Sequence, residues 1–189
     1  MMRALALALA VFCRQAAADE LAARVMQQLG AYAVVRADFV QERTVASMTR
    51  PVLSSGRMVL SRDDGLLWQV ESPTKLALVF PRRPGATRGG AVQAEMGRVI
   101  RSILSGDIAE LSSSFEVEAR GAPEHWTLRL VPKSRELAQY LQAIHLAGGR
   151  HLDAIDIAET SGERTALRMR NFAVASELAP AERQQFISP

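Results

Sequence analysis

Residues 57–70 have the sequence RMVLSRDDGLLWQV, and they indicate the architecture most clearly. Met58 and Leu60 alternate with Arg57 and Ser61, and this period of two predicts a half-buried strand. A polar turn that ends in Asp-Gly follows and leads into a second apolar run, which is a strong hairpin signal. We therefore expect two antiparallel strands joined by a tight turn.

Period-two runs also occur before and after this hairpin. Val35, Ala37 and Phe39 alternate with polar residues, and further short apolar runs are separated by turns that contain Gly or Pro. Short turns join antiparallel neighbours, so the sequence predicts one antiparallel sheet of about ten strands. The apolar side chains expected on one face of this sheet are Phe39, Met58, Leu60, Trp68, Leu76, Leu78, Phe80, Phe115, Val117, Trp126, Leu128, Leu130, Ile144, Ile155, Ile157, Leu167 and Met169.

Two other segments have helical periodicity. Asp19–Tyr32 is amphipathic, and Asp19 can act as its N-cap. A loop over Pro81–Gly90 precedes the second segment, which Gly106 ends. The apolar stripe of this second segment consists of Val92, Met96, Val99, Ile100, Ile103 and Leu104. We expect a single α+β domain in which both helices cover one face of the sheet.

The N-terminus has the features of a secretory signal peptide. A basic start, an apolar run to Phe12 and three small residues predict cleavage after Ala18. The run is shorter than the roughly 20 residues that span a bilayer, and Phe12 before Cys13 is too large for a lipid-attachment signal. A buried first helix is the alternative. We expect residues 1–18 to be a leader and 19–189 to be one exported, periplasmic domain.

Composition excludes several classes of protein. The chain has 189 residues, 23 Lys and Arg against 20 Asp and Glu, and a net charge of +3. Its single cysteine excludes a disulfide framework and a CxxC metal site. Aromatic residues make up 5% of the chain and no basic block exceeds two residues, which argues against nucleic-acid binding.

The sequence contains no recognisable catalytic or cofactor motif. His125, His145 and His151 lack the spacing of metal ligands, and neither GxSxG nor a Gly-rich phosphate loop occurs. We therefore expect no enzyme, no cofactor and no metal. The basic stretch at residues 82–88 is either a solvated loop or a contact for an anionic lipid or an acidic partner.

A curved sheet of this size presents more concave apolar surface than its own side chains fill. Either it closes into a barrel, or another group occupies that face. The alternative is an ordinary core in which the helices simply pack on the sheet. Composition does not distinguish these arrangements.

Several short motifs occur in an order typical of a known family. They are ADFVQ at 37–41, SSG at 54–56, Arg62 six residues before Trp68, Pro73, WTLRLVPK at 126–133 and GERT at 162–165. In this order they resemble the LolA family of periplasmic outer-membrane lipoprotein carriers, over nearly the whole mature chain.

The resemblance implies an open, incomplete antiparallel barrel, or half-barrel, with helices as a lid. Its hydrophobic cavity would shelter lipoprotein acyl chains or a related lipid. The face residues given above would line the cavity, and residues 92–104 would form the lid. Arg62 matches an arginine said to hold the lid closed through backbone carbonyls, which suits a group with five donors. An inner-membrane donor, an outer-membrane acceptor and a monomeric carrier are implied as well.

Some features depart from the family pattern. Asp63 replaces the usual proline after Arg62 and could pair with it, the loop Pro81–Gly90 replaces an expected hairpin, and Glu177–Pro189 lacks a clear closing strand. The segment Leu104–Asp107 resembles members associated with aryl-polyene or fatty-acid-type synthesis. A dedicated carrier for such a lipid and a non-catalytic sensor of lipids or lipoproteins are therefore alternative functions. An acyl-processing enzyme would need a nucleophile with a base at motif spacing, which the sequence lacks.

Overall fold

The structure, a computed structural model, describes residues 18–82, 99, 101–103 and 105–187. Nine strands form one antiparallel sheet in the order β4-β3-β2-β1-β9-β8-β7-β6-β5. Their bounds are β1 Val34–Thr44, β2 Val52–Ser61, β3 Gly65–Ser72, β4 Leu76–Pro81, β5 Phe115–Ala122, β6 His125–Pro132, β7 Leu141–Gly148, β8 Leu152–Glu159 and β9 Arg164–Ala175. The described residues thus contain nine strands where about ten were expected.

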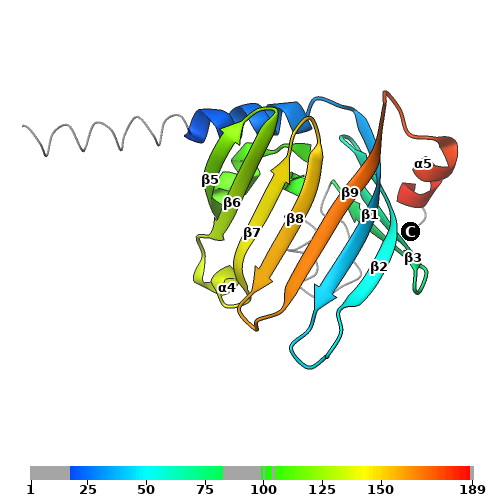
Figure 1. Cartoon of the computed structure of the whole chain (residues 1–189). Coiled ribbons are helices and arrows are strands. Elements are labelled where there is room, and N and C mark those ends of the chain that lie inside the picture. Colours follow the sequence, from blue (N-terminus) through cyan, green and yellow to red (C-terminus); the bar gives the residue numbers. More distant parts are fainter. Residues whose placement is uncertain (1–17, 83–98, 100, 104, 188–189) are drawn as a thin grey trace, which may run out of the picture.

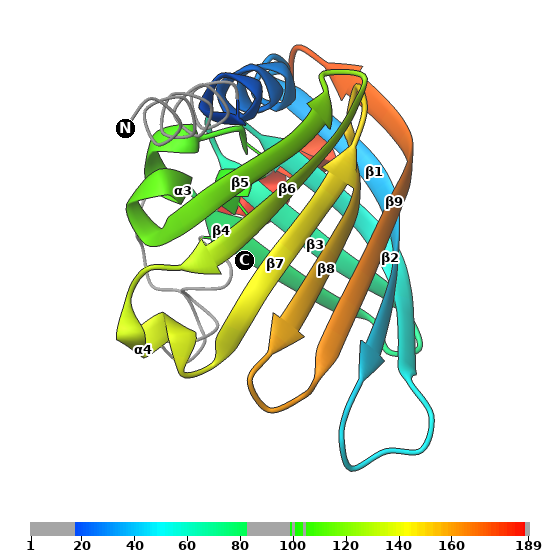
Figure 2. The same cartoon turned by 60° about the vertical axis from the view of Figure 1, so that its left-hand side comes forward.

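Two runs of consecutive hairpins meet in the middle of the sheet, where β9 pairs with β1 (Figure 1). The strands β4 and β5 are the two edges of the sheet, so the sheet is open. It is also strongly curved (Figure 2). Figure 2 shows the strands curving around the helical elements. The predicted α+β class and open antiparallel architecture are confirmed.

The hairpin predicted from residues 57–70 is formed as expected. Met58 pairs with Trp68 and Leu60 with Leu66 across β2 and β3. Ser61 closes the turn, since its Oγ donates to Asp64 Oδ2 at 2.6 Å. The two predicted antiparallel strands and their tight turn are therefore present.

The helices differ from expectation in number and extent. The N-terminal helix covers residues 18–29, so it ends before Tyr32. Residues 99, 101–103 and 105 of the second predicted helix are helical, and Gly106 follows them with a φ of +70°. Three short helices were not predicted, namely α3 (Ile108–Ser114), α4 (Arg135–Ala138) and α5 (Pro180–Ile187).

Side-chain caps explain where two of these short helices begin. The Asp107 carboxylate accepts from the Glu110 N–H at the start of α3, and Ser134 accepts from the Leu137 N–H at the start of α4. Pro180 occupies the first position of α5, which proline favours. Each helix has eight residues or fewer, too few for helical periodicity to stand out.

The outer, convex face of the sheet carries a second small core. Val34, Val59 and Leu67 project to this side and pack with Leu178. Arg36 holds α5 there through Nε and Nη2 bonds of 2.6 and 2.5 Å to the carboxylate of Glu182. The C-terminal segment that lacks a closing strand therefore covers the outer face of the first half of the sheet.

Candidate functional site

The concave face of the sheet brings most of the predicted cavity residues together. In the second half of the sheet, apolar residues lie opposite one another on neighbouring strands. For example, Leu128 of β6 pairs with Leu146 of β7, which pairs with Ile155 of β8. Thirteen of the predicted residues are buried in this single cluster. They are Phe39, Met58, Leu60, Trp68, Phe115, Trp126, Leu128, Leu130, Ile144, Ile155, Ile157, Leu167 and Met169.

The four remaining predicted residues lie nearer the edges of the sheet. Phe80 and Val117 are partly buried against the cluster. Leu76 and Leu78 of the edge strand β4 are 51% and 37% exposed. Because Leu78 pairs with buried Trp68, it lies on the same concave face. The apolar face therefore extends beyond the part that the helices cover.

Helices fill the covered part of the concave face. Val25 and Met26 of the N-terminal helix and Ile103 of the second helix are fully buried in the cluster. A small pocket beside Tyr32 and Phe172 has a volume of about 20 Å³, enough for roughly one water molecule. Within the described residues this pocket is too small for an acyl chain, and Val25, Met26 and Ile103 occupy the concave face.

The predicted lid residues are described in part. Val99 and Ile103 are buried against the sheet, whereas Val92, Met96, Ile100 and Leu104 lie outside the described residues. The end of this helix is in close contact with the end of the N-terminal helix. A Cβ on Gly106 would lie 2.0 Å from the Met26 carbonyl oxygen, so glycine is required for this approach.

Arg62 contacts the N-terminal helix. Its Nη2 donates to the Gly30 carbonyl oxygen at 2.6 Å, directly after the helix ends. Its own carbonyl accepts from Arg82 Nη1 at 2.5 Å. Among the ion pairs of the described residues, none joins Arg62 to Asp63. Arg62 therefore bonds a backbone carbonyl, but in the described residues that carbonyl belongs to the first helix and not to residues 92–104.

Arg101 ties the second helix to the sheet, a role that the sequence did not reveal. Its Nη1 donates to the Pro81 carbonyl oxygen at 2.8 Å, at the end of edge strand β4. Its Nη2 lies 3.7 Å from Glu110 Oε1 of α3. In the sequence, Arg101 is recognisable only as a cation within an apolar helical segment. Its partner is a backbone carbonyl, which no sequence motif identifies.

Further polar contacts hold the same C-terminal end of the N-terminal helix. Gln28 Nε2 and Trp126 Nε1 both donate to the Gly149 carbonyl oxygen, at 2.5 and 2.8 Å. Next to them the His151 ring stacks on Phe172, with centroids 4.6 Å apart. Burial, followed by the charge of Arg150, lowers the pKa of His151, which favours the neutral imidazole.

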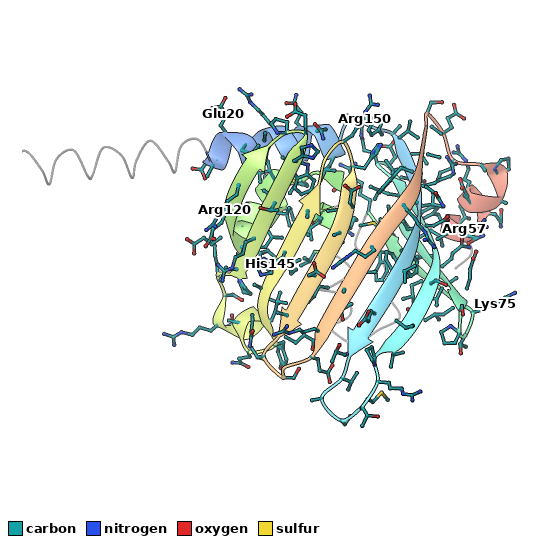
Figure 3. The ribbon with its side chains drawn as sticks, in the orientation of Figure 1. Glu20, Arg57, Lys75, Arg120, His145 and Arg150 are labelled. Atoms are coloured by element: carbon teal, nitrogen blue, oxygen red, sulfur yellow. The ribbon has the colours of Figure 1, made fainter. Side chains whose placement is uncertain are left out.

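The outer face carries hollows whose linings include charged side chains. Two hollows of about 470 and 380 Å³ lie over the second half of the sheet, and both include His145 and Asp156. His145 projects from β7 on this face (Figure 3). Within the described ranges, no group of three or more His, Cys, Asp or Glu side chains could hold a metal ion, and no helix is long and apolar enough to cross a membrane.

Comparison with known proteins agrees with this architecture. Residues 31–182 match the family model of the outer membrane lipoprotein carrier protein LolA. An outer-membrane lipoprotein carrier protein from Pseudomonas entomophila is 26% identical over 192 residues, which cover 96% of this chain and 91% of the relative.

Two solved structures are similar in fold. MucB has a TM-score of 0.52 and 13% identity, over 88% of this chain and 62% of MucB. A LolA superfamily protein from Nitrosomonas europaea has a TM-score of 0.46 and 10% identity, over 87% of this chain and 96% of its own. Because the family match spans most of the chain and the sheet is open and antiparallel, the protein is a divergent member of the LolA family of outer-membrane lipoprotein carriers.

Proposed function

We propose that this protein is a periplasmic carrier that shelters the acyl chains of lipoproteins, or of a related lipid, on the concave face of its sheet. The mature domain would comprise residues 19–189 after cleavage behind Ala18, and it would act as a monomer without catalysis. One observation carries the proposal: a continuous apolar face, built from strands of both halves of the sheet, is covered by helices instead of being closed into a barrel.

The hydrophobic effect would allow an acyl chain to replace the helix side chains on the concave face. A 16-carbon acyl chain in water costs on the order of 12 kcal/mol, at about 0.8 kcal/mol per CH₂. Withdrawing Val25, Met26 and Ile103 from the sheet would expose apolar surface that an incoming chain covers again. Met58 and Met169 on the face add adaptable side chains that suit cargo of varied shape.

In the described part of the chain, three side chains attach the cover to the rest of the domain through backbone carbonyls. Arg62, Arg101 and Gln28 each donate to a single backbone carbonyl. A hydrogen bond contributes about 1 kcal/mol net, so these contacts together resist opening only modestly. Such a cover would open to take up cargo from a donor in the inner membrane and to release it to an acceptor in the outer membrane.

Lipid binding is tested directly with protein purified from the periplasmic fraction. We expect organic extraction followed by mass spectrometry to yield an acylated molecule, and the protein to bind a fluorescent fatty acid. A stable protein partner without any bound lipid would favour the sensor alternative and overturn the carrier proposal. Co-purification of one polyene-type lipid would instead identify a dedicated carrier.

A matched pair of exposed leucines locates the binding face. Leu78→Glu places a charge on the concave face, whereas Leu53→Glu places one on the outer face, and both positions are exposed enough to tolerate it. We expect only Leu78→Glu to weaken fatty-acid binding, by about tenfold or more, since a buried charge opposes an apolar ligand. Equal effects from both variants would contradict binding on the concave face.

A further inference from the structure

The hairpin between β1 and β2 ends in exposed apolar side chains. Met48 in the connecting turn is 55% exposed, and Val52 and Leu53 at the start of β2 are 42% and 61% exposed. This hairpin projects past the ends of the neighbouring strands at the end of the sheet away from the N-terminal helix (Figures 1 and 2). A cluster of large exposed apolar residues on a projecting element indicates a contact surface.

The apolar side chains occupy both faces of the hairpin. Val52 pairs with Arg43 on the concave side, in line with Met58, while Leu53 pairs with Glu42 on the outer side. A rigid partner docked on one side would leave the other side in water. A fluid apolar phase surrounds the tip and covers both sides at once, as happens when a hairpin inserts into the acyl region of a bilayer.

The charge around the tip fits an anionic surface. Residues 43–57, RTVASMTRPVLSSGR, include three arginines and no acidic residue. Arg43 is 2.7 Å from Glu163, and Arg57 is 3.5 Å from Glu71. Arg50, beside Met48, is exposed and adds a cation at the tip. Basic residues flanking apolar ones are typical of segments that bind the interface of anionic membranes.

The same end of the sheet carries an exposed tyrosine. Tyr140 lies between α4 and β7 and is 57% exposed. Its carbonyl accepts from the Thr160 N–H, which places it next to the turn between β8 and β9. Tyrosine is enriched where membrane and water meet, because its ring is apolar and its hydroxyl polar. Tyr140 thus supplies a second contact at this end of the sheet.

We propose that the β1–β2 hairpin docks the protein on anionic phospholipid bilayers. Met48, Val52 and Leu53 enter the acyl region, and Arg50 contacts the lipid phosphates. Because Val52 continues the concave face, docking places the open end of that face against the bilayer. This surface goes beyond cargo binding, since it depends on exposed residues outside the buried cluster.

Tryptophan fluorescence tests insertion, because the two native tryptophans, Trp68 and Trp126, are only 8% and 1% exposed. Met48→Trp places a reporter at the tip. With vesicles of phosphatidylglycerol, we expect its emission to shift to shorter wavelength and brominated lipid to quench it. Ser176→Trp, directly after β9 at the opposite end of the sheet, is the matched control and should change much less. No shift for Met48→Trp, or equal shifts for both variants, would overturn the proposal.

A second measurement uses loss of binding. The double variant Met48→Ser, Leu53→Ser should co-sediment with phosphatidylglycerol vesicles about tenfold less than the wild type, because two apolar insertions are lost. Its binding of a fluorescent fatty acid should be unchanged, which separates docking from the carrier function. Undiminished co-sedimentation would show that another surface binds the membrane.

Discussion

Arg62, in the turn between β2 and β3, donates a hydrogen bond from Nη2 to the Gly30 carbonyl oxygen at 2.6 Å. A turn of the sheet thereby holds the C-terminal end of the N-terminal helix. Carbonyls at a helix C-terminus lack partners within the helix, and cations are favoured there by the helix dipole. Arg62 thus provides a hydrogen-bond donor for a carbonyl that has no partner within the helix, and it fixes this end of the N-terminal helix.

We expect Arg62→Ala to loosen this helix, because the contact contributes about 1 kcal/mol. Hydrogen exchange of the amides in residues 18–29 should become faster, and the rate of fatty-acid uptake should rise. Arg62→Lys keeps the charge and should restore part of the protection. Unchanged exchange in Arg62→Ala would contradict a role in holding the helix.

Replacing Arg101 should release the second helix from the edge of the sheet. Arg101→Met keeps the length of the side chain but loses the bond to Pro81 and the charge facing Glu110, so we expect the free energy of unfolding to fall by about 1.5 kcal/mol. Urea denaturation measures the change. Arg24→Met, at an exposed pair with Glu20, is the control and should change stability by less than about 0.5 kcal/mol.

Gly56 is required for packing between neighbouring strands. A Cβ at this position would lie 1.8 Å from the Gln69 carbonyl oxygen, where β2 and β3 shift in register. Gly56→Ala should therefore lower the midpoint of urea denaturation, by a loss of about 1–3 kcal/mol. Gly162→Ala tests a different cause, because its Cβ would meet nothing and only its φ of +87° opposes alanine. A larger loss at Gly162 would contradict the steric argument.

The pKa of His151, lowered by burial, makes stability depend on mildly acidic pH. The unfolded state binds a proton near pH 6.5, whereas the folded state does so at lower pH. The contribution of neutral His151 to the free energy of unfolding is therefore fully present above about pH 6.5. It is lost as the pH falls through the folded-state pKa. We expect His151→Phe to reduce this slope in thermal unfolding scans between pH 7 and 5.

The ion pair between Arg36 and Glu182 makes stability depend on pH in a separate, more acidic range. The bond from Arg36 lowers the pKa of Glu182, so its stabilisation is present above the ordinary carboxylate pKa and disappears as the pH falls through the lowered value. Glu182→Gln should remove this dependence and detach α5. Limited proteolysis after residue 175 measures detachment, and Glu177→Gln is the control.

Local periodicity accounts for what could be predicted. The alternation around Met58 and Trp68 was sufficient to assign a hairpin and its inward-facing residues, because period-two burial is imposed on neighbouring residues. The same reasoning predicted Val99 and Ile103 as buried positions of a helix. It placed Leu76 and Leu78 on the correct face but did not show that an edge strand leaves them exposed.

Contacts between distant segments account for what was missed. The partners of Arg62 and Arg101 are backbone carbonyls, which carry no residue-specific signal in the sequence. The attachment of α5 rests on Arg36 and Glu182, 146 positions apart. Short helices such as α4 form because of a cap and the surrounding fold, and four residues are too few for an apolar stripe.

The edge strands β4 and β5 have one partner each, although they follow one another among the strands of the chain. In a closed barrel, strand number and shear determine the diameter. Here β4 and β5 do not pair with each other among the described residues, so no strand pairing fixes the distance between the two rims. For the proposed carrier, an apolar face of adjustable width would accommodate cargo of different size.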